Sequence, residues 1–187
     1  MKKTFLFLTC ILMLCSMSDC EKDNAYYRSN ALDFNFTTAE SGSGTLFTAT
    51  ADDLTERQTG DRTLLFGADV HGESLPDGLS VTGITISLGT RRPIEAGMAY
   101  SHGNDGTSLK AILEYSGEDG MEHSAESSGG TLKTVIQHDR YAAGTFCFNF
   151  SLPVYGPDGS IIKTEPCRIT DGFFSIYMLH PDKITQD

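Results

Sequence analysis

The stretch GTFCFNFSL, residues 144–152, decides the fold because its side chains alternate between large apolar residues and small or polar ones. Phe146, Phe148 and Phe150 occupy every second position of this stretch. Successive side chains of a β-strand point to opposite faces of a sheet, so a period of two places the three rings on one face. The pattern predicts a strand with one face in a hydrophobic core and the other face toward solvent.

Similar short runs recur along the chain, and no segment from residue 31 onward has sustained helical periodicity. The turn sequences LPDG, GNDG, GEDG and GPDG separate them, since Gly and Asp tolerate positive φ. About nine short strands at this spacing predict an all-β fold, either an antiparallel β-sandwich or an irregular barrel. We expect a helical turn only within residues 50–59. The predicted strands cover residues 32–38, 44–50, 62–70, 81–88, 97–102, 109–116, 130–137, 144–152 and 167–178.

Two cysteines flank the turn sequence GPDG almost symmetrically. A hairpin that turns at Pro157 and Asp158 places Cys147 opposite Cys167 on the neighbouring antiparallel strand. A disulfide between them is one prediction, and it requires an oxidising compartment and a non-hydrogen-bonded register. Two free thiols are the alternative. A bulge or a longer loop would shift the pairing and turn the two sulfur atoms to opposite faces of the sheet.

The N-terminus has the features of a targeting segment. Residues 1–14, MKKTFLFLTCILML, begin with two lysines after the initiating Met and continue with an apolar run, as secretory signal peptides do. The run is shorter than the roughly 20 apolar residues of a transmembrane helix. Residues 1–19 resemble a bacterial lipoprotein signal peptide, in which a cysteine follows the cleavage site and receives a lipid. Cys20 is then the lipidated residue; the alternative is an incidental thiol in a conventionally cleaved leader.

The sequence after Cys20 gives the domain organisation. The residues EKDN resemble the acidic tether of Bacteroidota lipoproteins, which accompanies export to the cell surface. We therefore expect a lipidated cysteine and flexible tether over residues 20–30, followed by a single β-rich domain over residues 31–187. The resemblance implies attachment to the outer membrane through the N-terminal lipid, with the domain exposed at the cell surface.

Charge and motif content exclude several classes of function. The formal net charge of -11 argues against nucleic-acid binding, which needs clustered Lys and Arg. The five histidines are scattered, and neither a metal-ligand spacing nor a nucleophile–base motif is present. We therefore predict no catalytic residue, no metal and no cofactor. Acidic pairs such as Asp52–Asp53 and Glu118–Asp119 could serve a glycosidase, but adjacent acids in Gly-rich turns are usually solvated.

The C-terminal hairpins carry a family resemblance. Residues GGTLKTVIQHDRYAAGTFCFNF and CRITDGFFSIYM resemble a group of small, uncharacterised β-rich surface lipoproteins of the Bacteroidota. The matching motifs are Gly130–Thr134, Gly144–Phe148 and Ile169–Phe173. The resemblance implies an all-β fold and surface attachment, and it brings no established activity. The segment PVYGPDGSIIKTEP, residues 153–166, is longer than usual for the group.

These observations predict a lipid-anchored, non-catalytic lipoprotein of the cell envelope that binds an extracellular ligand, either a glycan or a protein. Two alternatives stay open: a barrel that carries a small apolar ligand, and a small hydrolase. A continuous apolar cavity would favour the carrier. A cleft with converging carboxylates would favour the hydrolase.

Overall fold

The computed structural model describes residues 30–39, 44–75, 78–138 and 140–177, and within them the chain is built from strands. Two short 3-10 turns, η1 (Ala51–Asp53) and η2 (Asn104–Gly106), interrupt them. No helix among these residues is long and apolar enough to cross a membrane. The strands are β1 (Ala31–Thr38), β2 (Thr45–Ala49), β3 (Leu54–Gly60), β4 (Thr63–Asp69), β5 (His71–Gly72), β6 (Ser80–Gly89), β7 (Ala99–Ser101), β8 (Ser108–Ser116), β9 (Glu122–Glu126), β10 (Gly129–His138), β11 (Tyr141–Tyr155) and β12 (Ile161–Tyr177).

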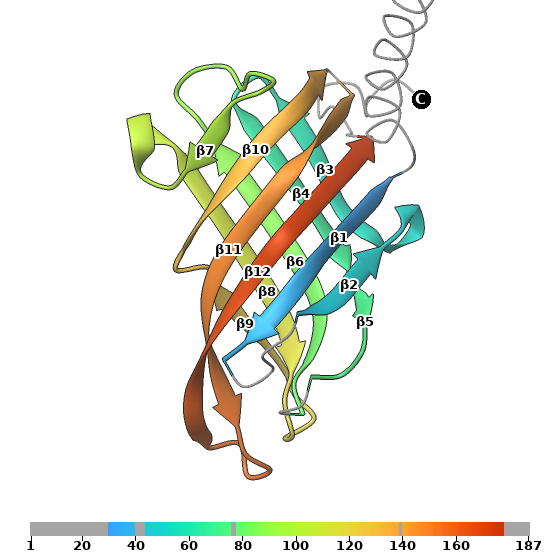
Figure 1. Ribbon diagram of the computed structural model, residues 1–187, viewed down its shortest axis with the longest axis vertical. Helices are drawn as coiled ribbons and strands as arrows, with labels where there is room; N and C mark the ends of the chain where they lie inside the picture. Colours follow the sequence, from blue (N-terminus) through green and yellow to red (C-terminus); the bar gives the residue numbers. More distant parts are fainter. Residues whose placement is uncertain (1–29, 40–43, 76–77, 139, 178–187) are drawn as a thin grey trace, which may run out of the picture.

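The strands form two antiparallel sheets that pack face to face as a sandwich (Figure 1). The seven-stranded sheet has the order β5-β2-β1-β12-β11-β10-β7, and the five-stranded sheet has the order β3-β4-β6-β8-β9. The predicted all-β sandwich is confirmed. The alternative of a barrel is wrong, because the described strands leave two separate sheets with free edges.

Aromatic residues on the inner faces hold the two sheets together. The predicted phenylalanine stripe is confirmed, since Phe146, Phe148 and Phe150 are all buried in one continuous core. Phe174 of β12 stacks on Phe66 of β4 with ring centroids 4.6 Å apart, which joins the two sheets directly. Burial of each such side chain contributes about 1.5–3 kcal/mol, so the inner face of β11 and β12 is a main source of stability.

The sandwich has two distinct ends. The upper end of Figure 1 carries the start of β1 at Ala31, the end of β12 at Tyr177 and the β3–β4 turn. The lower end carries the β8–β9 turn and the β11–β12 hairpin, which extends below the other strands (Figure 1). The residue that follows the predicted tether therefore lies at the opposite end from the long hairpin.

The structure differs from the sequence prediction mainly at polar edge strands. Residues 51–53 form the expected helical turn, whereas the second turn at Asn104–Gly106 was not expected. Leu54–Gly60 is a strand at the edge of the five-stranded sheet. Edge strands tolerate charged residues, which also discourage pairing with other chains, so β3 lacks the apolar pattern of a central strand. Glu122–Glu126 at the opposite edge was missed for the same reason.

Substitutions at two neighbouring glycines can test the tight pairing of β10 with β11. A Cβ atom at Gly130 would clash with the Phe148 ring and the Cys147 carbonyl, whereas a Cβ atom at Gly129 would meet nothing within 4 Å. We expect Gly130→Ala to lower the free energy of unfolding by about 1–3 kcal/mol, as overpacking does. Urea unfolding measures this change. Gly129→Ala is the control and should stay within about 0.5 kcal/mol of the wild type; equal effects of the two substitutions would contradict this packing.

Candidate functional site

The structure places Cys147 and Cys167 on opposite faces of the β11–β12 hairpin, so their predicted direct opposition is wrong. Cys167 is buried in the core opposite Phe150. Cys147 is half-buried on the outer face, where its Sγ lies 3.1 Å from Thr131 Oγ1 of β10. The two sulfur atoms are not joined by a disulfide. Cys20, the predicted lipidation site, lies outside the described residues.

The register of the β11–β12 hairpin explains why the two cysteines lie on opposite faces. Tyr155 pairs with Ile161, while Val154 pairs with Lys163, so Ile162 is an extra residue in β12. The longer turn and this bulge move Cys167 three residues along β11, from the predicted partner Cys147 to Phe150. An odd shift exchanges the two faces of a strand. Cys167 therefore points inward beside the phenylalanine stripe.

A second irregularity in β12 lies directly opposite Cys147. Phe146 pairs with Gly172 and Phe148 pairs with Ile169, so two residues of β12 face a single residue of β11. One of them, Asp171, has a φ of 52°, a conformation that Asp tolerates better than most residues. Such bulges bend a strand and redirect its side chains. Asp171 Oδ2 accepts a hydrogen bond of 3.4 Å from Asn35 Nδ2 of β1 on the outer face.

A broad hollow lies on the outer face of the seven-stranded sheet. Its volume is about 720 Å³, and it extends over β1, β12 and β11. Arg168 pairs with Thr37 on one side and Asn149 on the other, so these three residues form one row across the sheet. We call them the Arg168 row. Its guanidinium, amide and hydroxyl groups can donate or accept several hydrogen bonds at once.

The surroundings of the Arg168 row add to its hydrogen-bonding capacity. Thr170 and Ser151 also line this hollow. They lie in the rows of paired residues on either side of the Arg168 row. Arg168 is exposed, and among the described residues it makes no ion pair. An exposed guanidinium without a carboxylate partner is free to bind oxygen atoms of a ligand with its fork of N–H groups.

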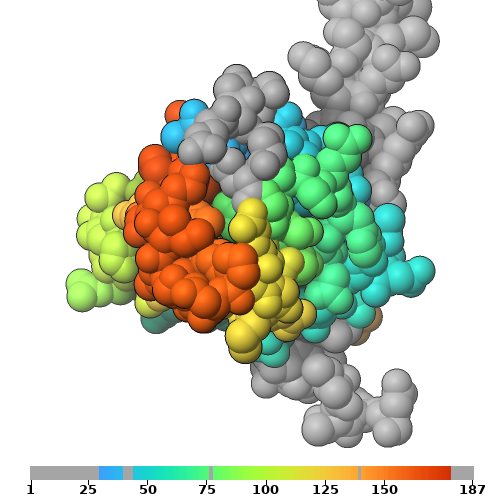
Figure 2. All heavy atoms as spheres, turned by 90° about the horizontal axis from the view of Figure 1, so that it is seen from below, coloured from blue at the N-terminus to red at the C-terminus, as the bar shows by residue number. Residues whose placement is uncertain are grey.

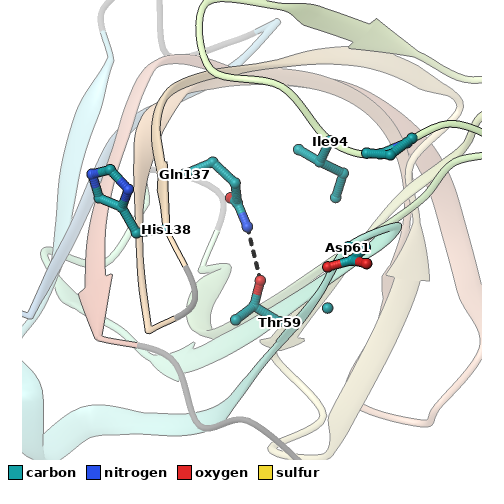
Figure 3. Close-up of a pocket in the computed structure, with 7 residues that line it drawn as sticks. Thr59, Asp61, Ile94, Gln137 and His138 are labelled. Carbon is teal, nitrogen blue, oxygen red and sulfur yellow. Dashed lines mark hydrogen bonds between the residues drawn. The ribbon is translucent and has the colours of Figure 1, made fainter.

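A smaller pocket of about 170 Å³ lies at the upper end (Figure 3). It joins the two sheets, because Thr59 and Asp61 come from the β3–β4 hairpin and Gln137 and His138 come from the end of β10. Ile94 lines the side formed by the loop after β6, and its backbone N–H donates to the Asp61 carbonyl at 2.7 Å. The His138 ring is turned away from the other labelled side chains (Figure 3).

Gln137 is the main polar group of this pocket. Its Nε2 donates a hydrogen bond of 2.9 Å to Thr59 Oγ1, which links β10 to β3 across the two sheets (Figure 3). Its Oε1 is buried and has no hydrogen-bond partner among the described residues. A buried acceptor without a partner costs about 1–3 kcal/mol, which a bound water removes. The size and polarity of the pocket suit a few waters or a small polar group rather than an apolar ligand.

Two histidine–carboxylate pairs stabilise loops. His71 Nε2 lies 3.0 Å from Asp53 Oδ1, and His123 Nε2 lies 2.9 Å from Asp119 Oδ2. The Thr50 backbone N–H donates to Asp53 and, together with His71 and the Thr50 hydroxyl, lowers the pKa of this carboxyl to about 2. The pKa of Asp119 is also lowered, first by the N–H of Met121 and then by His123.

These pairs do not form the arrangement of a hydrolase in the described part of the chain. Neither His71 nor His123 hydrogen-bonds a hydroxyl or thiol side chain there. Asp53 and Asp119, one member of each acidic pair considered in the sequence, accept hydrogen bonds within their own turns. The described residues also contain no group of three or more His, Cys, Asp or Glu side chains that could hold a metal ion.

Comparison of the chain with protein-family models, with curated proteins and with solved structures found no match. The resemblance to Bacteroidota lipoproteins therefore stays a prediction from the sequence. The candidate sites rest on the geometry of the described residues.

Sequence reasoning missed both the Arg168 row and the upper pocket. Thr37, Asn149 and Arg168 are far apart in the sequence, and only the register of three strands aligns them. One signal was present: Asn149 alternates with the phenylalanines, so its outward direction followed from the pattern. The position of Arg168 beside it depended on the bulge at Ile162, which no local pattern indicates.

The different environments of the two thiols predict different reactivities. A thiol reagent such as iodoacetamide should modify Cys147 in the folded mature protein, because this side chain is half-buried at an open hollow. Cys167 should react only after unfolding, because it is buried in the core. Peptide mass spectrometry after labelling distinguishes the two sites. A peptide pair joined by a Cys147–Cys167 disulfide in the oxidised protein would contradict the register.

Proposed function

We propose that the chain is a lipid-anchored, non-catalytic binding protein of the outer membrane that holds an extracellular glycan on the outer face of its seven-stranded sheet. The observation that carries this proposal is the hollow over the Arg168 row, with its volume of about 720 Å³. The hollow is open to solvent, and the Arg168 row that lines it carries hydrogen-bonding groups. A sugar chain is rich in hydroxyl groups and can lie along such a surface.

The chemistry of the row favours a glycan that carries oxygen acceptors near its centre. Arg168 offers a planar fork of N–H donors, which matches a carboxylate or a pair of hydroxyl groups. Asn149 can donate and accept on either side of a sugar hydroxyl, and Thr37 adds a hydroxyl from β1. Because all three side chains are held on paired strands, little ordering of the backbone is required when a ligand binds.

The position of the predicted anchor agrees with this role. Ten residues, 21–30, separate Cys20 from Ala31 at the upper end of the sandwich. They span at most about 33–36 Å when fully extended. The outer face of the sheet runs along the length of the sandwich. An anchor at the upper end would therefore leave this face exposed to solvent and not pressed against the membrane.

The alternatives have less support. A carrier of small apolar ligands was expected as a barrel, whereas the strands pack as a sandwich filled by phenylalanine and aliphatic side chains. For a hydrolase, two carboxylates would have to converge on one cleft. Asp53 follows β2, whereas Asp119 lies in the β8–β9 turn at the lower end, and each accepts hydrogen bonds in its own turn.

A glycan-array screen with the mature domain, followed by titration of the bound glycan, tests the site. Loss of a charged hydrogen-bonding group costs about 1.5–3 kcal/mol, so Arg168→Ala should weaken binding about tenfold or more. Arg62→Ala removes the same charge from an exposed position in the β3–β4 turn and is the control. Absence of any glycan ligand, or an equal loss in both variants, would refute the proposed site.

The anchor has a separate test in the full chain expressed in a diderm bacterium. Wild-type protein should fractionate with the membrane and carry acyl chains on Cys20, because several buried CH₂ groups contribute about 0.8 kcal/mol each to membrane binding. Cys20→Ala should lose the acyl chains and leave the outer-membrane fraction. Cys15→Ala is the matched control and should behave like the wild type. Membrane attachment that survives Cys20→Ala would exclude this anchor.

A further inference from the structure

Three large apolar side chains are exposed on the two neighbouring segments that form the lower end of the sandwich. Met121 is 62% exposed in the β8–β9 turn, and Ile161 and Ile162 are 59% and 63% exposed at the start of β12. Seen from below, the β11–β12 hairpin lies beside the β8–β9 turn and forms this end of the molecule (Figure 2). We call these three residues the lower apolar tip. Exposed apolar residues scattered singly are ordinary, whereas a group of them marks an interaction surface.

The hairpin that carries Ile161 and Ile162 is fixed to the other sheet by aromatic contacts. Tyr155 of β11 stacks on His123 of β9, with ring centroids 3.8 Å apart and an interplanar angle of 8°. The Tyr115 hydroxyl of β8 donates a hydrogen bond of 2.8 Å to the Pro153 carbonyl of β11. His123 is held in turn by Asp119, so the β8–β9 turn and the hairpin form one structural unit.

The turn of the hairpin is also ordered by its own hydrogen bonds. Asp158 Oδ1 accepts from the Ser160 backbone N–H at 3.0 Å and from the Ser160 hydroxyl at 2.7 Å. The Gly156 N–H donates to the Ser160 carbonyl at 2.8 Å. A binding surface that is ordered before contact loses less entropy when it binds. Ile161 and Ile162 follow directly after this turn and are presented in a defined position.

Acidic residues lie close to the tip in the sequence, and Lys163, which follows Ile162, is paired with Glu165 at 3.3 Å. Glu118 and Glu122 flank Met121 in the sequence, Asp158 precedes the two isoleucines, and all three acidic residues are exposed. The hydrogen bonds from Ser160 lower the pKa of Asp158, which is therefore ionised at neutral pH. The chain as a whole carries a formal charge of -11. A second copy of the chain and an anionic lipid surface would both be repelled by this charge.

We infer that the lower apolar tip is a docking surface for a second protein, one that presents an apolar recess bordered by Lys or Arg side chains. The apolar residues supply the contact that excludes water, and the acidic rim selects a cationic border. This surface lies at the opposite end from Ala31, so it faces away from the predicted lipid anchor. It is separate from the Arg168 row, and a protein partner there does not depend on glycan binding.

Site-specific photocrosslinking in the cells that produce the protein tests this inference. The crosslinker p-benzoyl-phenylalanine is placed at position 162, and the control carries it at position 112, where Ile112 is 40% exposed in the five-stranded sheet. Position 162 should give a crosslinked product of one discrete mass that contains a different protein, and position 112 should not. No product above the control, or a product with lipid or with a second copy of the chain, would overturn the inference.

Binding of the purified crosslinked protein then tests the chemistry of the surface. The double substitution Ile161→Ser and Ile162→Ser should weaken the affinity by about tenfold or more, as loss of central interface residues does. Binding should also weaken as salt is raised, because the charges of the rim are exposed. Ile112→Ser is the control for a lost exposed isoleucine, and unfolding curves confirm that each variant is folded. Full affinity in the double variant, or binding that is independent of salt, would contradict the proposed surface.

Discussion

The pairing of β11 with β12 is the interaction on which the rest of the structure depends. These two long strands occupy the middle of the seven-stranded sheet and bring their apolar faces into the core. Phe174 of this pair stacks on Phe66 and thereby fixes the second sheet against the first. Because side chains alternate along each strand, the register that places the phenylalanines inside also determines which polar residues line the outer face.

The same pair of strands generates both candidate surfaces. On its outer face the register aligns Arg168 with Asn149, and β1 adds Thr37 to the row. At its lower end the hairpin continues past the neighbouring strands and exposes Ile161 and Ile162 (Figure 1). One surface offers hydrogen bonds along a sheet, and the other offers an apolar contact with an acidic border. The two surfaces thus suit ligands of different chemistry on one rigid scaffold.

The sequence was sufficient for the fold class and for most strands, but not for the candidate sites. The alternation in residues 144–152 is a local property, so it identified the strand and the buried face correctly. The edge strands β3 and β9 were missed because exposed edges need no apolar pattern. The prediction that Cys147 lies opposite Cys167 was wrong because Ile162 is an additional residue in β12. Such a bulge depends on how the two strands pack and is not visible in the local sequence. The Arg168 row depends on the same register and was missed with it.

The most direct test of this account is the register of β11 and β12 in solution. Backbone NOEs in an NMR study of the mature domain report which residues of two antiparallel strands lie opposite each other. The account predicts cross-strand NOEs between Asn149 and Arg168 and between Phe150 and Cys167. Cross-strand NOEs between Cys147 and Cys167 would show the unshifted hairpin, which would separate Arg168 from Asn149 and remove the proposed glycan site.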